Sequence, residues 1–250
     1  MTISRRDILK IFGLTGVASA VQTASSVAEA QGQALTLTIL HCNDTHDRLE
    51  PTTISGKDAS GKDFTVQYGG VARIKTAIDT LKQDAINPIV LDAGDVFTGT
   101  IFGMIYKGLA DLAYMEAFGV QVQTIGNHEF DNGPKQLADY AKNATFPVVS
   151  ANVDVSGEPL LKDLIKKSAT LEIGGQKVGI VGVTTQDTPI TSSPGDTVKF
   201  LDALTSVQAE VDRLRSSGVT KIVLLSHIGY SKDLELAKKL KGVGVIVGGY

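Results

Sequence analysis

Short apolar runs alternate with segments of helical periodicity along most of the chain, and this alternation constrains the fold more than any other sequence feature. Residues 35–41 form a β-branched and apolar run that predicts a strand, whereas residues 71–81 carry apolar side chains at helical spacing. Further strands are predicted at residues 88–91, 121–125, 146–150, 221–225 and 243–247. Further helices are predicted at residues 101–118, from Pro134 onward, and at residues 201–215 and 232–240. Strands that alternate with helices indicate the α/β class.

Two segments carry the pattern of a hairpin or surface excursion. Residues 170–183 contain two apolar runs on either side of Gly174-Gly175, which predicts a β-hairpin. Residues 54–66 are rich in Gly, Lys, Asp and Ser, and predict an excursion of hairpin type at the surface.

The composition is that of an ordinary globular protein and excludes several classes of function. The chain has 250 residues, which is long enough for one large domain with a buried core. Of these residues, 42% are apolar and 20% are charged. The net charge of −3 gives no support for binding to a nucleic acid polymer or an anionic membrane. Cys42 is the single cysteine, so the sequence contains neither an internal disulfide nor a thiolate-built metal site.

Residues 1–30 predict an export signal that is not part of the fold. Arg5 and Arg6 open the segment, residues 11–21 are mildly apolar, and a small-residue cleavage site ends at Ala30. The paired arginines resemble a twin-arginine signal, so we expect the twin-arginine translocase as a partner and a periplasmic or extracellular product. The apolar run is too short to span a membrane, so no stable membrane anchor is expected after signal removal.

Acidic, imidazole and carboxamide side chains recur where the predicted strands end. The candidates are Asp44 and His46 after the first strand, Asp95 after the second, Asn127, His128 and Asp131 after the third, and His227 after the strand at 221–225. The carboxyl ends of strands in an open α/β sheet face one crevice, which is the usual ligand site. Each residue alone would more often be a cap or turn residue, but four independent loops of the same kind favour one shared site.

The mixture of donor types favours a transition-metal site. Carboxylate, carboxamide and imidazole groups together suit Mn, Fe, Zn or Co, rather than a thiolate site or an all-oxygen site. A carboxylate such as Asp95 can bridge two cations about 3.5–4 Å apart, as in two-metal phosphatases. His41 lies within the first strand, and Glu129 follows the third strand as a support for its loop, so both are predicted to be structural.

Longer strings of residues point to a family. The chain resembles the calcineurin-like metallophosphoesterase family in Asp44-x-His46, Gly94-Asp95, Gly126-Asn127-His128-Glu129 and His227. It resembles the bacterial 5′-nucleotidase and UDP-sugar hydrolase branch in residues 39–46, 69–74, 126–133 and 150–153. The resemblance covers residues 35–249 and implies a metallophosphoesterase-type β-sandwich of mixed sheets flanked by helices. It implies a single domain of this type at residues 31–250.

The resemblance also implies roles for individual residues. It implies two divalent metal ions, with Asp44, His46 and Asp95 as ligands of one, and Asp95, Asn127 and His227 as ligands of the other. The catalytic residues would be His128, beside the leaving ester oxygen, and Asp131, which would orient its imidazole and stabilise its charge. Arg73 is either a site residue or a surface charge of a helix.

The activity that the resemblance implies is metal-dependent hydrolysis of a nucleotide or another small phosphoester, with a role in nucleotide catabolism. A 5′-nucleotidase is the first choice. A cyclic-nucleotide phosphodiesterase, a UDP-sugar hydrolase and a sulfate-thiol hydrolase are alternative enzymes. A non-catalytic or vestigial metal-binding domain is the alternative from a different class.

The sequence departs from the family pattern at its C-terminal end. Members of the family continue after a strand such as residues 243–247 into Gly-Gly-His-x-His or Gly-Gly-His-x-Gln, which supplies one further ligand to each metal. Here Gly248-Gly249 is followed by Tyr250. The domain is therefore expected to be incomplete at this end, either as a fragment or as a degenerate copy.

Overall fold

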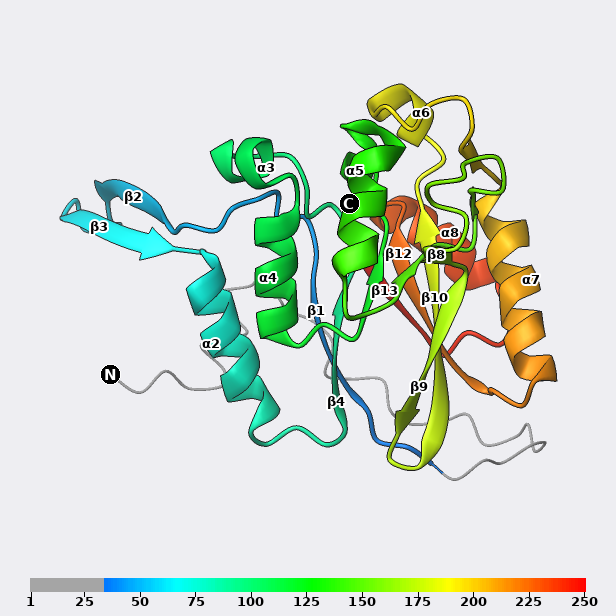
Figure 1. The fold of residues 1–250 in the computed structure, drawn as a ribbon. Coiled ribbons are helices and arrows are strands. Elements are labelled where there is room, and N and C mark those ends of the chain that lie inside the picture. Colours follow the sequence, from blue (N-terminus) through cyan, green and yellow to red (C-terminus); the bar gives the residue numbers. More distant parts are fainter. Residues whose placement is uncertain (1–33) are drawn as a thin grey trace. The chain divides into compact units, whose positions relative to one another are not determined.

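Two β-sheets that pack face to face carry the fold over residues 34–250, the part of the chain that this computed structural model describes (Figure 1). The predicted export signal at residues 1–30 lies outside the described residues. None of the helices between residues 34 and 250 has the length and apolar character needed to span a membrane.

The first sheet has five strands, and every neighbouring pair in it is parallel. Its spatial order is β1 (Thr38–Cys42), β4 (Pro88–Asp92), β5 (Val122–Thr124), β6 (Val148–Val149) and β8 (Ile165–Lys166). The helices on its outer face are α2 (Val71–Lys82), α4 (Leu109–Phe118) and α5 (Gly133–Asn143). Their apolar sides meet the sheet in a core that includes Ile78, Met115 and Leu137. Burial of each such side chain stabilises the fold by about 1.5–3 kcal/mol.

The second sheet has four strands and is mixed. Its spatial order is β13 (Val245–Gly249), β12 (Lys221–His227), β10 (Gln176–Thr184) and β9 (Ser168–Ile173), with only β9 antiparallel to its neighbour. Its outer face is covered by α7 (Ala203–Ser216) and α8 (Tyr230–Lys239). Ile89, Val178 and Val223 belong to the core between the two sheets. The predicted α/β sandwich is confirmed, although one of its sheets is entirely parallel.

The two sheets contact each other near the carboxyl ends of β6 and β10. Gly182 of β10 leaves no room for a side chain, because a Cβ there would lie 2.3 Å from the carbonyl oxygen of Val149. The Ala151 N–H donates to the Gly182 carbonyl at 2.8 Å, and the Thr184 hydroxyl donates to the Ile125 carbonyl at 2.7 Å. These contacts fix the sheets against each other beside the loops that carry the polar side chains.

The prediction of one helix over residues 101–118 is wrong, because the structure contains α3 (Ile101–Tyr106) and α4 instead. Lys107 and Gly108 separate the two helices, with φ values of 52° and 90°. A Cβ at Gly108 would lie 2.5 Å from the ring of Phe97, so glycine is what permits this close turn. Apolar residues continue through both helices, and the sequence pattern therefore carries no sign of the break.

Elements too short to show a period are missing from the sequence prediction. They are η1, a 3-10 turn (His128–Phe130), β7 (Val153–Asp154), β8, α6 (Thr188–Thr191) and β11 (Lys199–Phe200). The other predicted elements are present with ends shifted by a few residues, as is usual for helix and strand boundaries. The hairpin predicted around Gly174-Gly175 is confirmed as β9 and β10.

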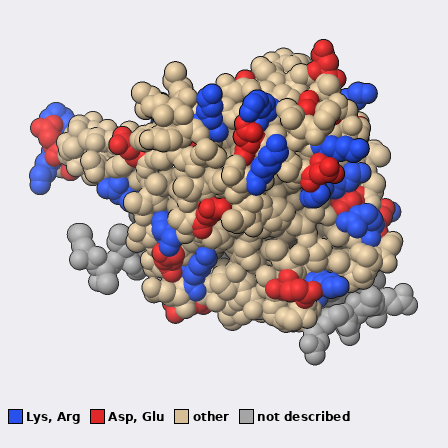
Figure 2. All heavy atoms as spheres, viewed as in Figure 1, with Lys and Arg blue, Asp and Glu red and all other residues tan. Residues whose placement is uncertain are grey.

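A second hairpin, formed by β2 (Thr52–Lys57) and β3 (Asp63–Tyr68), confirms the predicted surface excursion and projects at the left of Figure 1. Both strands are exposed along their whole length. Lys57 and Asp63 form an ion pair of 2.8 Å near the turn. Figure 2 shows acidic and basic side chains interspersed over the visible face, which therefore carries mixed charge rather than charge of one sign.

Candidate metal centre

Loops at the carboxyl ends of four strands bring the predicted site residues together. The residues are Asp44 and His46 after β1, Asp95 after β4, Asn127, His128 and Asp131 after β5, and His227 at the end of β12. Two of these loops are joined by backbone hydrogen bonds, from the Asp44 N–H to the Gly94 carbonyl at 2.9 Å and from the His46 N–H to the Asp95 carbonyl at 3.2 Å. Because β12 belongs to the second sheet, both sheets contribute to the site.

Three of the candidate ligands have an unusual backbone conformation. Asp44, His46 and Asp95 have φ values of 52°, 46° and 58°, in the left-handed region that residues other than glycine seldom adopt. Such strain persists only where the surrounding structure fixes it, and it concentrates at functional sites. The backbone therefore holds these side chains in preset directions.

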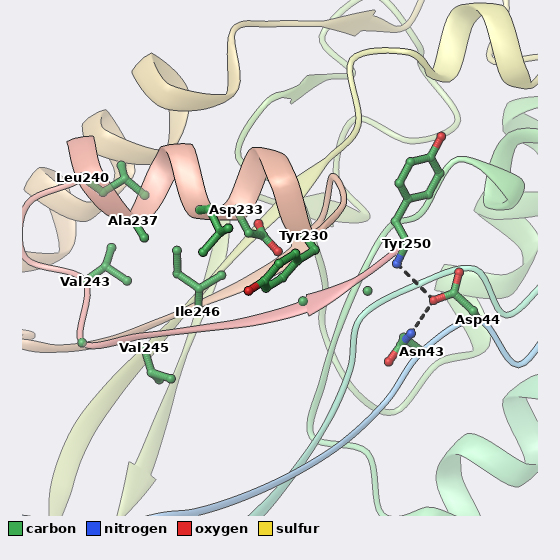
Figure 3. Close-up of a pocket in the computed structure, with 14 residues that line it drawn as sticks. Asn43, Asp44, Tyr230, Asp233, Ala237, Leu240, Val243, Val245, Ile246 and Tyr250 are labelled. Carbon is green, nitrogen blue, oxygen red and sulfur yellow. Dashed lines mark hydrogen bonds between the residues drawn. The ribbon is translucent and has the colours of Figure 1, made fainter. Parts of the chain in front are cut away.

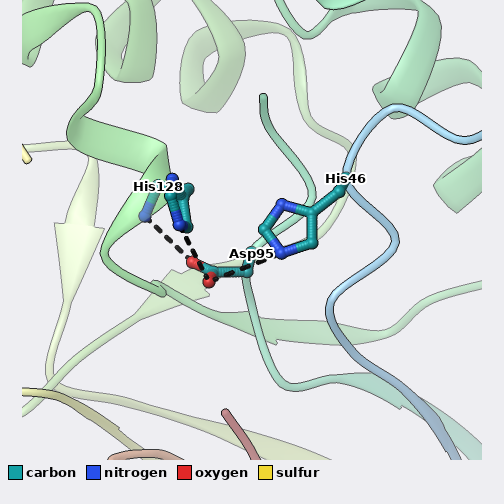
Figure 4. Close-up of side chains that lie close together, drawn as sticks. All are labelled: His46, Asp95 and His128. Atoms are coloured by element: carbon teal, nitrogen blue, oxygen red, sulfur yellow. Dashed lines mark hydrogen bonds and ion pairs between the residues drawn. The ribbon is translucent and has the colours of Figure 1, made fainter. Parts of the chain in front are cut away.

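The side chains form two groups that share Asp95. One group contains Asp44, Asp95 and His227, and the other contains His46, Asp95 and His128, with the ligand atoms of each group within 4.8 Å of one another. The second group is drawn in Figure 4, where both imidazoles face the Asp95 carboxylate. Asp95 Oδ2 lies 3.1 Å from His227 Nε2 and 3.9 Å from His46 Nε2. A carboxylate shared by two groups is the arrangement that a pair of neighbouring cations requires.

Backbone carbonyl groups orient two of the imidazoles. His227 Nδ1 lies 2.6 Å from the Ala93 carbonyl oxygen, and His46 Nδ1 lies 3.0 Å from the carbonyl oxygens of Phe97 and Thr98. A carbonyl oxygen can only accept, so each Nδ1 carries a hydrogen, which leaves each Nε2 facing Asp95. Metal-binding histidines are usually oriented in this way by a second partner.

Buried polar atoms show whether the residues fit a cation. Within residues 34–250, the Oδ1 atom of Asn127 is buried and has no hydrogen-bond partner, as is true of carboxylate oxygens of Asp47, Asp92 and Asp111 outside the two groups. The Nε2 atom of His227 is also buried, and only Asp95 Oδ2 lies near it, at 3.1 Å. A buried polar atom left unpaired costs about 1–3 kcal/mol. Asn127 and His227 are both predicted to bind a metal. A bound cation would satisfy the buried atoms of these two residues, so the donor set fits a metal centre.

His128 and Asp131 form a hydrogen-bonded pair at the edge of the centre. His128 Nδ1 lies 2.6 Å from Asp131 Oδ2, and His128 Nε2 lies 4.0 Å from Asp95 Oδ2. Burial alone would lower the pKa of His128, but the hydrogen bond to Asp131 and the charges of Asp95 and Asp131 outweigh it and raise this pKa. The imidazole can therefore hold a proton on Nε2 beside the centre.

Glu129 supports the loops without joining either group. Its carboxylate is buried and accepts hydrogen bonds from the backbone N–H groups of Asp95, Val96, Phe97 and Gly126, at 2.6–3.3 Å. The bonds join the loop after β4 to the loop after β5. This agrees with the structural role predicted for Glu129.

Other residues singled out in the sequence lie outside the two groups. His41 lies within β1. Arg73 is exposed and donates to the Gly69 carbonyl and the Gln67 side chain at the junction of β3 and α2. Its contacts match the surface-charge alternative. Conversely, sequence reasoning missed Ser192, whose hydroxyl donates to Asp131 at 2.7 Å, because no motif or period marks its segment.

A pocket of about 600 Å³ adjoins the centre (Figure 3). It lies between α8 and β13, and its lining includes Asp44, Tyr230 and Tyr250. The backbone N–H of Tyr250 donates to Asp44 Oδ2 at 3.2 Å, and the Tyr250 ring lies 5.2 Å from that of His227. The end of β13 therefore lies beside the candidate ligands.

Comparison with known families gives a match over almost all described residues. The model of the calcineurin-like phosphoesterase family matches residues 37–249. A 5′-nucleotidase of Diplobatis ommata is 42% identical over 240 residues, which cover 94% of this chain and 41% of that protein. The chain thus spans less than half of the length of this relative.

Solved structures show the same similarity. A 5′-nucleotidase precursor from Thermus thermophilus is 51% identical, with a TM-score of 0.81 over 86% of this chain and 41% of that one. The NAD nucleotidase of Haemophilus influenzae is 37% identical, with a TM-score of 0.79 over 86% of this chain and 42% of that one. In both cases the similarity covers the described domain and less than half of the solved chain.

Proposed function

Because the chain belongs to the calcineurin-like phosphoesterase family, whose members bind two divalent metal ions, we propose that it hydrolyses nucleoside 5′-monophosphates to nucleosides and inorganic phosphate. The observation that carries this proposal is Asp95, a buried carboxylate shared by two groups of ligand side chains. The nucleotide substrate is supported by the 5′-nucleotidases among the relatives.

The proposed ligands are Asp44, His46, Asp95, Asn127 and His227. His128 lies in one of the two groups, but we assign it to the proton donor rather than to a metal. Mixed oxygen and imidazole donors suit Mn, Fe, Zn or Co. When bound, two such cations would hold phosphate oxygens and make a water molecule acidic enough to attack phosphorus. The orienting bonds on His46 and His227 keep both Nε2 atoms directed at that position.

We assign the leaving-group chemistry to His128 and Asp131. As the oxygen of water bonds to phosphorus, the bond from phosphorus to the ribose 5′ oxygen breaks, and that oxygen takes the electron pair. His128 Nε2 then donates a proton to it, while Asp131 accepts the hydrogen bond from Nδ1 and stabilises the charged ring. The attacking water releases one proton to solvent, and His128 takes one proton from solvent before the next turnover. The hydrogen bond between His128 Nδ1 and Asp131, which raises the pKa of His128, supports this role.

Replacement of His128 by alanine tests this function. We expect His128→Ala to lower kcat for AMP by about 10²–10⁴-fold, the usual contribution of a general acid, while metal content stays that of the parent protein. The measurement is phosphate release from AMP with added Mn²⁺, beside metal analysis of both proteins. His41→Ala is the matched control, because His41 lies in neither group.

The substrates compared in the same assay decide between the alternatives. Faster turnover of a cyclic nucleotide, a UDP-sugar or a sulfate-thiol compound than of AMP would replace the nucleotidase proposal by the corresponding hydrolase. Metal binding without turnover of any ester would instead support a non-catalytic metal-binding domain.

We also propose that the protein is exported by the twin-arginine translocase, on the strength of Arg5 and Arg6 in the sequence. Replacing both residues with lysine should leave the precursor in the cytoplasm, as seen by immunoblotting of cell fractions. A Lys10→Arg variant is the control, since it changes a neighbouring basic residue and keeps the pair. Unchanged export of the lysine variant would refute this route.

A further inference from the structure

We propose that Ser192 is a positioning residue for the proton donor of the site, an inference that rests on the proposed hydrolytic function. Its hydroxyl fixes the Asp131 carboxylate, which in turn fixes the His128 imidazole. Ser192 lies 61 residues from Asp131 in the sequence, in a segment that contains no recognised motif.

The two oxygens of Asp131 have different partners. The Ser192 hydroxyl donates to Oδ1 at 2.7 Å, and His128 Nδ1 lies 2.6 Å from Oδ2. A carboxylate bonded at one oxygen alone can turn about its terminal torsion, whereas one bonded at both oxygens is held in one plane. The serine therefore determines where Oδ2 stands, and Oδ2 determines the direction of the imidazole.

The segment that carries Ser192 is itself tied to the site. The Ser192 N–H donates to the Thr188 carbonyl at 2.9 Å and ends α6, and the Ser193 N–H donates to the Phe130 carbonyl in η1 at 3.3 Å. At the other end of α6, Asp187 pairs with Lys232 of α8 at 2.7 Å. Ser192 is half-buried. These contacts give the hydroxyl a defined position.

The expected consequence concerns the chemical step rather than substrate binding. Without the hydroxyl, the Asp131 carboxylate can turn toward water, and the imidazole loses its fixed direction toward the leaving oxygen. Loss of such a supporting partner typically costs about 10–100-fold in activity. The loss should appear only where the leaving group needs a proton.

The test compares Ser192→Ala, Ser192→Thr and Ser193→Ala in the full chain with added Mn²⁺. For AMP and for a simple alkyl phosphate, we expect Ser192→Ala to lower kcat at least about tenfold with KM unchanged. For para-nitrophenyl phosphate, whose leaving group needs no proton, the change should be under about twofold, because no proton transfer is lost. Ser192→Thr retains a hydroxyl and should restore most of the rate. Ser193→Ala is the matched control, since the Ser193 side chain is exposed.

A double-mutant cycle separates positioning from a general structural role. In an Asp131→Ala background, Ser192→Ala should cause no further loss, because its only proposed effect passes through Asp131. Equal losses for alkyl and para-nitrophenyl esters, or losses that add across the cycle, would overturn the proposal.

A spectroscopic readout keeps this inference separate from the proposed function. The chain has four histidines, so ¹⁵N-histidine spectra of metal-free protein can resolve the His128 ring. We expect a protected Nδ1 hydrogen in the parent protein that exchanges faster with water in Ser192→Ala and not in Ser193→Ala. An unchanged His128 signal would overturn the Ser192 inference. Failure of the parent protein to hydrolyse any ester would refute the proposed function alone.

Discussion

Replacement of Asp95 by alanine should remove both metal ions and lower phosphoesterase turnover by at least about a thousandfold, which corresponds to roughly 4 kcal/mol at the transition state. Asp95 belongs to both groups of candidate ligands and lies 3.1 Å from His227 Nε2. It also accepts the His128 backbone N–H at 2.9 Å, so the loop carrying the proton donor would lose an anchor. Elemental analysis after reconstitution with Mn²⁺ and a phosphate-release assay would measure both effects.

The control for Asp95→Ala is Asp139→Ala. Asp139 is an exposed carboxylate of α5 that pairs with Lys135 and touches no candidate ligand. We expect this variant to retain the metal content and the turnover of the parent protein. An Asp95→Ala protein that still bound two ions would contradict the shared-ligand arrangement.

Glu129→Ala should be the most destabilising single change at the site. It would leave four backbone N–H groups without their acceptor in loops that exclude water. Each unpaired buried group costs about 1–3 kcal/mol, and partial relaxation should leave a net loss of roughly 3 kcal/mol or more. Urea unfolding of the metal-free protein would measure this loss of unfolding free energy. Metal affinity should fall as well, because the bonds hold the loop of Asp95 against the loop of Asn127.

Glu116→Ala provides the comparison for Glu129→Ala. Glu116 is an exposed residue of α4, and its truncation should change the free energy of unfolding by less than about 0.5 kcal/mol. If Glu129→Ala unfolded at the same urea concentration as Glu116→Ala, the hydrogen bonds to the loops would contribute little to stability.

The sequence predicted the helices and strands that are long enough to show a periodicity, and the site residues that follow the ends of strands. Regular strands such as β12 and helices such as α2 have enough residues to show their periodicity, so both were identified with small boundary errors. The candidate ligands followed from one rule, that loops after strands of an α/β sheet face a common crevice. The break at Gly108 was missed because it depends on contact with Phe97, which no local pattern encodes.

The hydrogen-bond partners of the candidate site residues could not be predicted either, because they also depend on contacts between distant segments. A hydroxyl at position 192 has no local mark of function, and its link to Asp131 exists only after α6 has folded onto η1. Glu129 was predicted to be structural, but its four backbone donors come from two loops whose approach is set by the packing of β4 against β5. The residue types of a site can be read from a sequence, whereas the contacts between residues from distant segments depend on the tertiary fold.

The candidate centre contains residues from both sheets, so metal binding should stabilise the packing of one sheet against the other. Asp44 and Asp95 follow strands of one sheet and His227 ends a strand of the other, so a cation bound by this group would cross-link the two halves of the sandwich. A ligand that binds only the assembled form adds its binding free energy to the stability of that form. Chelating agents would then act on this protein as mild denaturants, and their effect would be largest along the seam between the sheets.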